Sequence, residues 1–251
     1  MKHSAFWRSV IVAGAVLAIE FLCRAGIINR VTMVPPSQMA VALVNMIRTA
    51  PWFWSDAGST FRNIGAAIAL SIVLGFLIGL VIHALPRLRA VLNPVLLSYY
   101  SVPTFVYYPL LIVIFGIGSA SLIAMGALFG VVAMISATLA SIDRIPPVYG
   151  KVARVTRLSP WQTALRIKLP AATPHLITGI KLAVSYSVIG VIAGEFIIAT
   201  AGLGRRLTLS YNEFDTATMY GLILLIFIAV AIVNSVLQRW EARVHRRWYR
   251  A

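Results

Sequence analysis

Few residues of this chain have side chains that could do chemistry, and those few do not cluster in the sequence. The 251 residues include seven Asp and Glu, four His and one Cys. The single cysteine, Cys23, excludes an internal disulfide and any Cys-based zinc or iron–sulfur site. The histidines form no His-Glu-x-x-His motif, and no Gly-x-x-x-x-Gly-Lys-Ser/Thr phosphate loop is present, so any nucleotide hydrolysis must occur on another chain. The sequence therefore predicts a protein that is not itself an enzyme, with no catalytic residue, cofactor or metal site.

Glu195 is the residue whose type and position point most directly to a function. It lies within a long apolar stretch, where an acidic side chain is costly unless it faces water or a partner. Two roles are open for it. It either lines a path for a translocated solute, or it forms hydrogen bonds to a neighbouring helix near the outer end of the stretch. Glu20, in contrast, is expected to reach the membrane interface.

The elements that must position these residues are six apolar stretches. The chain is 60% hydrophobic and only 12% charged, with a mean hydropathy of +0.88, whereas a soluble domain has about twice that charged fraction. Stretches of roughly 20 residues are long enough to cross about 30 Å of hydrocarbon as helices. Their approximate ranges are 8–27, 62–85, 92–115, 119–142, 176–199 and 217–238. The sequence therefore predicts an all-α membrane protein with about six transmembrane helices.

Two of these stretches need comment. The third contains Pro94, Pro103 and Pro109, which must bend or break a helix locally, and broken helices in membranes usually line a cavity. The first resembles a signal peptide, but Glu20 and Arg24 occupy the positions where a small-x-small cleavage site would lie. We therefore expect the first stretch to be retained as a helix.

The distribution of basic residues predicts the orientation in the membrane. With the N-terminus inside, 16 of the 22 Lys and Arg residues are cytoplasmic and six are outside, which satisfies the positive-inside rule. The net charge of +15 therefore does not require a nucleic-acid partner. Both termini are therefore expected in the cytoplasm.

The segment 143–175 is the one long cytoplasmic loop, and its pattern predicts two short helices joined by a turn. Apolar residues from Val148 to Leu158 recur at spacings of three and four, with basic residues on an adjoining face. Ser159 occupies an N-cap position before Pro160. Such a helix–turn–helix could lie on anionic headgroups at the membrane surface, or it could dock a cytoplasmic partner.

These residues carry a family resemblance. The segment from Lys151 to Pro170 resembles the EAA loop of ABC importer permeases, whose pattern is Glu-Ala-Ala, then Gly, then Leu-Pro. The resemblance extends from about Val34 to Trp248. The segments that carry it include Trp161-Gln162-Thr163, Leu169-Pro170-Ala171-Ala172, Ser59-Thr60-Phe61-Arg62, Pro109 to Gly118, Ala193-Gly194-Glu195 and Gly202-Leu203-Gly204.

This chain departs from the family pattern in the first half of the loop. Lys151 replaces the usual acidic residue, Val152 replaces the first small residue and Arg157 replaces the usual glycine. In the family this loop fits a groove on the ATPase subunit. Either the ATPase has changed with the loop, or a second permease subunit carries a more typical loop.

The resemblance implies a single transmembrane domain over 1–251, with a core at about 55–240 and a coupling loop at 143–175, in the type I ABC importer fold. It implies a permease subunit that imports a small solute of the nitrate, sulfonate, taurine or pyrimidine-precursor class by alternating access. The implied partners are cytoplasmic ABC ATPase subunits, an external solute-binding protein, a second permease subunit and membrane lipids. The residues implied in ATPase docking are Lys151, Val152, Ala153, Arg157, Trp161, Leu165, Leu169 and Pro170. A self-contained secondary transporter is the main alternative, although the chain shows neither the repeated halves nor the midplane charges typical of one.

Overall fold

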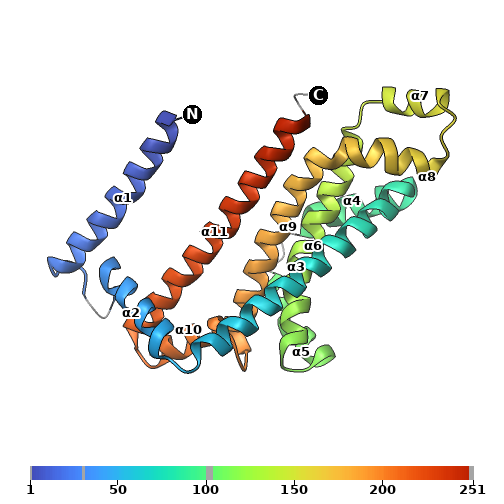
Figure 1. Ribbon diagram of the computed structural model, residues 1–251. Coiled ribbons are helices and arrows are strands. Elements are labelled where there is room, and N and C mark those ends of the chain that lie inside the picture. The colour runs from blue at the N-terminus through green and yellow to red at the C-terminus, as the bar shows by residue number, and fades with distance from the viewer. Residues whose placement is uncertain (1, 30–31, 100–103, 249–251) are drawn as a thin grey trace.

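The computed structural model describes residues 2–29, 32–99 and 104–248, and all regular structure in these ranges is helical (Figure 1). The long helices are α1 (Lys2–Arg24), α3 (Phe53–Ala84), α6 (Ser119–Asp143), α9 (Leu169–Ile198) and α11 (Thr216–Trp248). The shorter ones are α2 (Pro36–Thr49), α4 (Pro86–Ser98), α5 (Tyr108–Phe115), α7 (Val148–Val155), α8 (Pro160–Thr163) and α10 (Leu203–Asn212). A 3-10 turn (Thr104–Tyr107) precedes α5, and a π-helical turn, η3 (Ala164–Lys168), joins α8 to α9. The all-α prediction is confirmed.

Four segments of the described chain are long and apolar enough to cross a membrane. They are Phe53–Ala84, Ser119–Asp143, Arg166–Ile197 and Thr216–Val244. They correspond to the second, fourth, fifth and sixth stretches expected from the sequence. The first stretch forms the continuous helix α1 but does not meet the same criteria, so its crossing of the membrane stays a prediction.

The third expected span is not one helix. It is divided into α4, the 3-10 turn and α5, as the prolines predicted. Pro94 lies inside α4, and Pro109 lies in the first turn of α5, where its missing N–H costs no helical hydrogen bond. Pro103 lies outside the described residues. Neither piece alone is long enough to span the hydrocarbon. Because α3 and α6 both run from the end that contains α10 to the end that contains α7, the chain between them returns across the bundle in these shorter pieces (Figure 1).

The core lies where α6 packs between α3 and α9. Small residues allow these helices to approach closely: a Cβ on Gly190 would lie 2.8 Å from the Cα of Gly126. One turn along, the hydroxyls of Ser71 and Ser187 lie 3.0 Å apart against Gly130, so α3, α6 and α9 meet there. Small residues therefore form the contact surfaces of α3 and α9, whereas Gly65 of α3 has no neighbour within 4 Å of its Cβ position.

Two helices that the hydropathy pattern does not predict, α2 and α10, close one end of the bundle. Leu43 and Met46 of α2 pack with Phe53, Leu203 and Leu222 in one buried apolar cluster. The sequences of α2 and α10 are short and amphipathic, so neither helix contains an apolar run long enough to be recognised as a span. This cluster joins α2, α3, α10 and α11 at the end where Glu195 lies.

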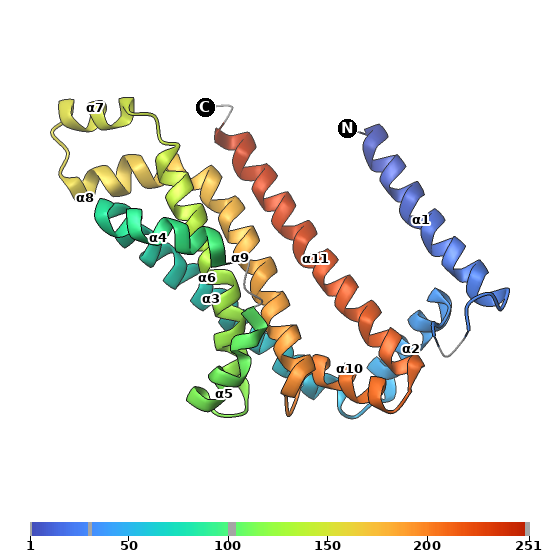
Figure 2. The same ribbon diagram turned by 180° about the vertical axis from the view of Figure 1, so that it is seen from behind.

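The two ends of the bundle are different. Both views place the first residues of α1, the last turns of α11 and the helix α7 together at one end, with α2, α5 and α10 at the other (Figures 1 and 2). The 143–175 segment and the two chain ends therefore share a side, as the charge distribution predicts. Which side faces the cytoplasm stays a prediction from that charge distribution.

Candidate functional site

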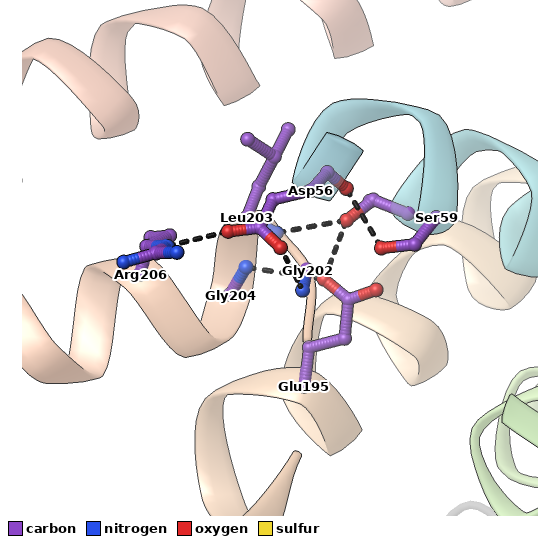
Figure 3. Close-up of polar contacts among 8 residues, drawn as sticks. Asp56, Ser59, Glu195, Gly202, Leu203, Gly204 and Arg206 are labelled. Carbon is purple, nitrogen blue, oxygen red and sulfur yellow. Dashed lines mark hydrogen bonds and ion pairs between the residues drawn. The ribbon is translucent and has the colours of Figure 1, made fainter. Parts of the chain in front are cut away.

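Glu195 lies near the last turn of α9 and is fully buried (Figure 3). Its Oε2 accepts a hydrogen bond from the hydroxyl of Thr60 over 2.8 Å and one from the backbone N–H of Gly204 over 3.1 Å. The Thr60 hydroxyl oxygen in turn accepts from the backbone N–H of Leu203 over 2.9 Å. The carboxylate thus joins α9 to α3 and to the first turn of α10.

A second acidic residue, Asp56, completes this polar cluster from the first turn of α3. Its side chain is nearly buried; Oδ1 accepts from the backbone N–H of Gly202 over 3.2 Å, and Oδ2 forms an ion pair with Arg206. The Arg206 guanidinium also lies 4.7 Å from the ring centroid of Trp52. The α9–α10 loop is therefore held by two carboxylates, one at each side.

Two oxygens in this cluster have no hydrogen-bond donor within the described part of the chain. They are Oε1 of Glu195 and Oδ1 of Asn63, both buried. The Asn63 side chain also lies beside the Glu195 carboxyl group. Because both of these unpaired oxygens are acceptors, a hydrogen-bond donor introduced beside them would satisfy both at once.

The structure brings together motifs that the sequence could only place separately. The Ser59–Arg62 segment, the segment around Glu195 and the Gly202–Gly204 turn all meet in this cluster. Gly202 has φ of +114°, and a Cβ there would lie 2.6 Å from both carboxylate oxygens of Glu195. The roles of Asp56 and Arg206 were missed, and their only signal in the sequence is that they flank the two apolar stretches that the cluster joins.

An apolar cavity of about 230 Å³ lies beside the cluster, between α3, α9, α10 and α11. Its lining is almost entirely aliphatic and aromatic, and the polar residues in it are Thr60, Ser185 and Asn234. No charged residue lines it. This cavity therefore offers no counter-ion to a charged solute.

The predicted helix–turn–helix of the 143–175 segment is confirmed as α7 followed by α8. The Ser159 hydroxyl accepts from the backbone N–H of Gln162 over 3.2 Å, and the Gln162 side chain accepts from the backbone N–H of Ser159 over 3.1 Å. This reciprocal pair is a capping box, which fixes the start of the second helix. Just before α7, Asp143 accepts from Arg89 of α4 (2.8 Å), and this hydrogen bond raises the pKa of Arg89.

The segment does not end as the sequence suggested. Although the loop was expected to extend to residue 175, the chain continues as helix from α8 through η3 into α9. Pro170 lies in the first turn of α9, directly after the wider π-helical turn, and Pro174 is accommodated inside α9. A π-helical turn changes the hydrogen-bonding register, so a proline there need not stop the helix.

The expected docking residues lie at the same end of the molecule but differ in exposure. Lys151 and Arg157 are exposed, Val152 is 46% exposed and Ala153 is buried. Leu169 is exposed, and Pro170 is half-buried. The backbones of Trp161 and Leu165 lie in α8 and η3, while their side chains lie outside the part of the chain that the structure describes. Glu195 lies at the opposite end of α9, so the two candidate sites are separate.

Arg157 has an unusual backbone conformation. It follows α7 with φ of +51°, in the left-handed region that glycine adopts without strain. The N–H groups of Arg157 and Leu158 return to the carbonyls of Arg154 and Ala153 over 3.2 and 3.0 Å, as in a helix end that usually contains glycine. Arginine therefore stands at a position where the backbone favours glycine.

Comparison with known proteins identifies relatives over most of the chain. The family described as binding-protein-dependent transport system inner membrane component matches residues 71–250. A probable ABC transporter permease protein of Haemophilus influenzae is 31% identical over 174 residues, which are 67% of this chain and 71% of that protein. The taurine transport system permease protein TauC of Escherichia coli is 27% identical over 227 residues, which are 88% of this chain and 80% of that protein.

A solved structure has a similar fold. A chain of the MetNI methionine ABC transporter superposes with a TM-score of 0.67 at 18% identity, covering 78% of this chain and 99% of that chain. The predicted fold, that of a type I ABC importer transmembrane domain, is thereby confirmed. Since the family match covers well over half of the chain, including α7, α9 and Glu195, the chain belongs to the family of binding-protein-dependent transport system inner membrane components.

Proposed function

We propose that this chain is the permease subunit of an ATP-driven importer and moves a small solute by alternating access. The observation that carries the proposal is the family match over residues 71–250, which includes both candidate sites. The whole chain, 1–251, acts as one transmembrane domain, with a core at about 55–240. ATP hydrolysis takes place on a separate subunit, because the sequence has no phosphate loop.

The cytoplasmic ATPase docks on the 143–175 segment. In α7, Ala153 is the buried position, and successive residues are about 100° apart around a helix. Val148, Lys151 and Val155 therefore point away from the body of the protein, and both valines are more than half exposed. A helix lying on lipid would turn its valines back toward the membrane, so this direction favours a protein partner. Val152, Trp161, Leu165, Leu169 and Pro170 complete the proposed docking set.

Lys151 and Arg157 determine which ATPase is accepted. Within the described part of the chain neither Lys151 nor Arg157 forms an ion pair with a carboxylate, so the matching carboxylates would come from the partner. An unmatched charge at an interface penalises the wrong partner more than it strengthens the right one. The strained backbone at Arg157 supports this role. Glycine would adopt this conformation with less strain, so an arginine is expected here only if its side chain has a function.

Glu195 acts at the outer end of the translocation path. Of the two roles open from the sequence, its complete burial in the single chain supports the one in which it holds neighbouring elements together. Its contacts with Thr60 and Gly204 fix the α9–α10 loop, and a displacement of that loop would be coupled to α9. In this way the residue would take part in opening and closing without touching the solute.

A second permease subunit is needed to form the path. Only 11% of the most apolar window of α11, and 22% of that of α3, is buried within the chain. One subunit therefore leaves most of these surfaces to lipids or to a partner. We propose a dimer of permease subunits in a bacterial cytoplasmic (inner) membrane, with both termini in the cytoplasm.

The transported solute is proposed to belong to the nitrate, sulfonate, taurine or pyrimidine-precursor class. The sequence resemblance and the similarity to a taurine permease support this class. The test is to purify the complex with its ATPase, reconstitute it in proteoliposomes with an external binding protein, and measure uptake of a panel of these solutes. Uptake should require ATP and the binding protein. Uptake driven by an ion gradient without ATP would instead support the secondary-transporter alternative.

A further inference from the structure

Within the described part of the chain, the turn between α10 and α11 exposes two aromatic side chains at the end opposite α7. All five residues from Tyr211 to Asp215 are exposed, with Tyr211 at 62% and Phe214 at 80%. In both views α10 lies at the end away from the two chain ends (Figures 1 and 2). The turn is therefore on the outer side in the proposed orientation. Phe214 is largely exposed and adds little to the packing of the chain.

The backbone holds Phe214 in a fixed and unusual conformation. Its φ is +58°, a region that bulky residues rarely adopt. The N–H of Asp215 donates to the carbonyl of Ser210 over 2.9 Å, which closes the end of α10. On the other side, Oδ1 of Asp215 accepts from the backbone N–H of Thr218 over 3.1 Å and caps α11. An aromatic side chain is thus presented in a preformed position where glycine would cause less strain.

The charges around Phe214 are also distinctive. Five of the seven carboxylates of the chain have a side-chain partner: Glu20 with Arg24, Asp56 with Arg206, Asp143 with Arg89, Glu195 with Thr60 and Glu241 with Lys181. The other two, Glu213 and Asp215, flank Phe214 directly. The Glu213 side chain has no partner within the described part of the chain. A chain of net charge +15 therefore presents an acidic, aromatic tip at this turn.

We infer that the α10–α11 turn, residues 211–215, is a docking surface for the external solute-binding protein, with Phe214 as its anchor. The partner's complementary surface is an apolar pocket with Lys or Arg at its rim, because Glu213 and Asp215 lie beside the ring. Insertion of Phe214 into lipid is disfavoured, since it would draw two carboxylates toward the hydrocarbon. This inference rests on the proposed function, because the family imports solutes through such a binding protein.

The experiment uses the complete complex in nanodiscs. The binding protein to be used as probe is first identified as the one that stimulates ATP hydrolysis by the unchanged complex. Its affinity is then measured by surface plasmon resonance for Phe214→Gly, Phe214→Ala, Glu213→Gln and Asp215→Asn. Phe214→Gly relieves the backbone strain, and Asp215→Asn keeps a capping oxygen, so neither should unfold the turn. Phe227→Ala is the matched control, since Phe227 is 70% exposed on α11 but lies within a span.

Both Phe214 variants should bind the probe at least tenfold more weakly, with basal ATP hydrolysis unchanged and its stimulation lost at the same probe concentration. Glu213→Gln and Asp215→Asn should weaken binding and reduce its dependence on salt. Phe227→Ala should bind like the unchanged complex. Unchanged affinity of Phe214→Gly and Phe214→Ala would overturn the inference while leaving the importer function intact. If no binding protein stimulates the unchanged complex, the proposed function itself fails.

Discussion

The hydroxyl of Thr60 donates a hydrogen bond to the carboxylate of Glu195 over 2.8 Å, although 135 residues separate them in the sequence. Both residues are buried, so the bond forms in a medium where an unpaired partner is costly. It connects the first third of α3 to the last turn of α9 and thereby fixes the loop that leads into α10.

Replacing Glu195 with Gln should leave complex assembly intact and preserve most of the transport activity. The Gln oxygen can still accept from Thr60 and Gly204, and its NH₂ group supplies a donor where Glu195 and Asn63 both present bare acceptors. Glu195→Ala should instead lower the stability by about 1–3 kcal/mol, because two buried donors lose their acceptor. Unfolding in detergent and uptake in proteoliposomes measure the two effects. An assembled Glu195→Gln complex that does not transport would show that the carboxylate charge acts in the path itself.

Replacing Gly202 with Ala should destabilise the protein. The new Cβ would lie 2.6 Å from both oxygens of Glu195, and φ of +114° is unfavourable for any residue with a Cβ. Gly65→Ala is the matched control, because nothing lies within 4 Å of its Cβ position and it is inside a helix. The control should be as stable as the unchanged chain or slightly more so. Equal melting temperatures for the two variants would mean that the α9–α10 loop is not held as described.

Cysteine labelling should confirm the orientation of the two ends. After Cys23 is replaced by Ser, single cysteines at Trp54 and Asn212 should react with a membrane-impermeant maleimide added from outside, since both positions are exposed at the end that contains α10. A cysteine at Arg154, which is exposed on α7, should react only after the membrane is permeabilised. The reverse pattern would refute the charge-based topology.

The ATPase should be lost when Trp161 is replaced by Ala. A large aromatic anchor commonly contributes 2 kcal/mol or more to an interface, so retention of the ATPase during purification in detergent should fall at least tenfold. The resting fold should not change, because the capping box of Ser159 and Gln162 is preserved. Full retention together with normal transport would mean that this segment only lies on the membrane.

The charge departures in the same segment allow a separate test. Lys151→Glu combined with Arg157→Gly should preserve or broaden pairing with ATPases of related importers, measured by co-purification. Arg157→Gly alone should also stabilise the chain by about 1 kcal/mol, because it removes a side chain from a left-handed position. Loss of all ATPase pairing in the double variant, with its own ATPase included, would contradict a role in partner choice.

The sequence by itself determined the helical class, four of the spans, the capped helix–turn–helix and the family. These features depend on local properties: the length of apolar runs, the positions of Pro, and the Ser159–Gln162 pair that forms the capping box. Glu195 could be recognised as unusual for the same reason, because a carboxylate in an apolar run is conspicuous without any knowledge of its neighbours.

Only the tertiary structure decided what these residues contact. Asp56, Thr60 and Arg206 are ordinary polar residues until the folding of α3 against α9 and α10 brings them to Glu195 and Gly202, and no local pattern specifies contacts across more than 100 residues. The same holds for Phe214, whose exposure and left-handed backbone follow from how α10 ends and α11 begins. The third stretch was apolar enough to be counted as one continuous span, but the structure divides it into α4, a 3-10 turn and α5, because hydropathy measures only side chains and not where the backbone leaves the helix.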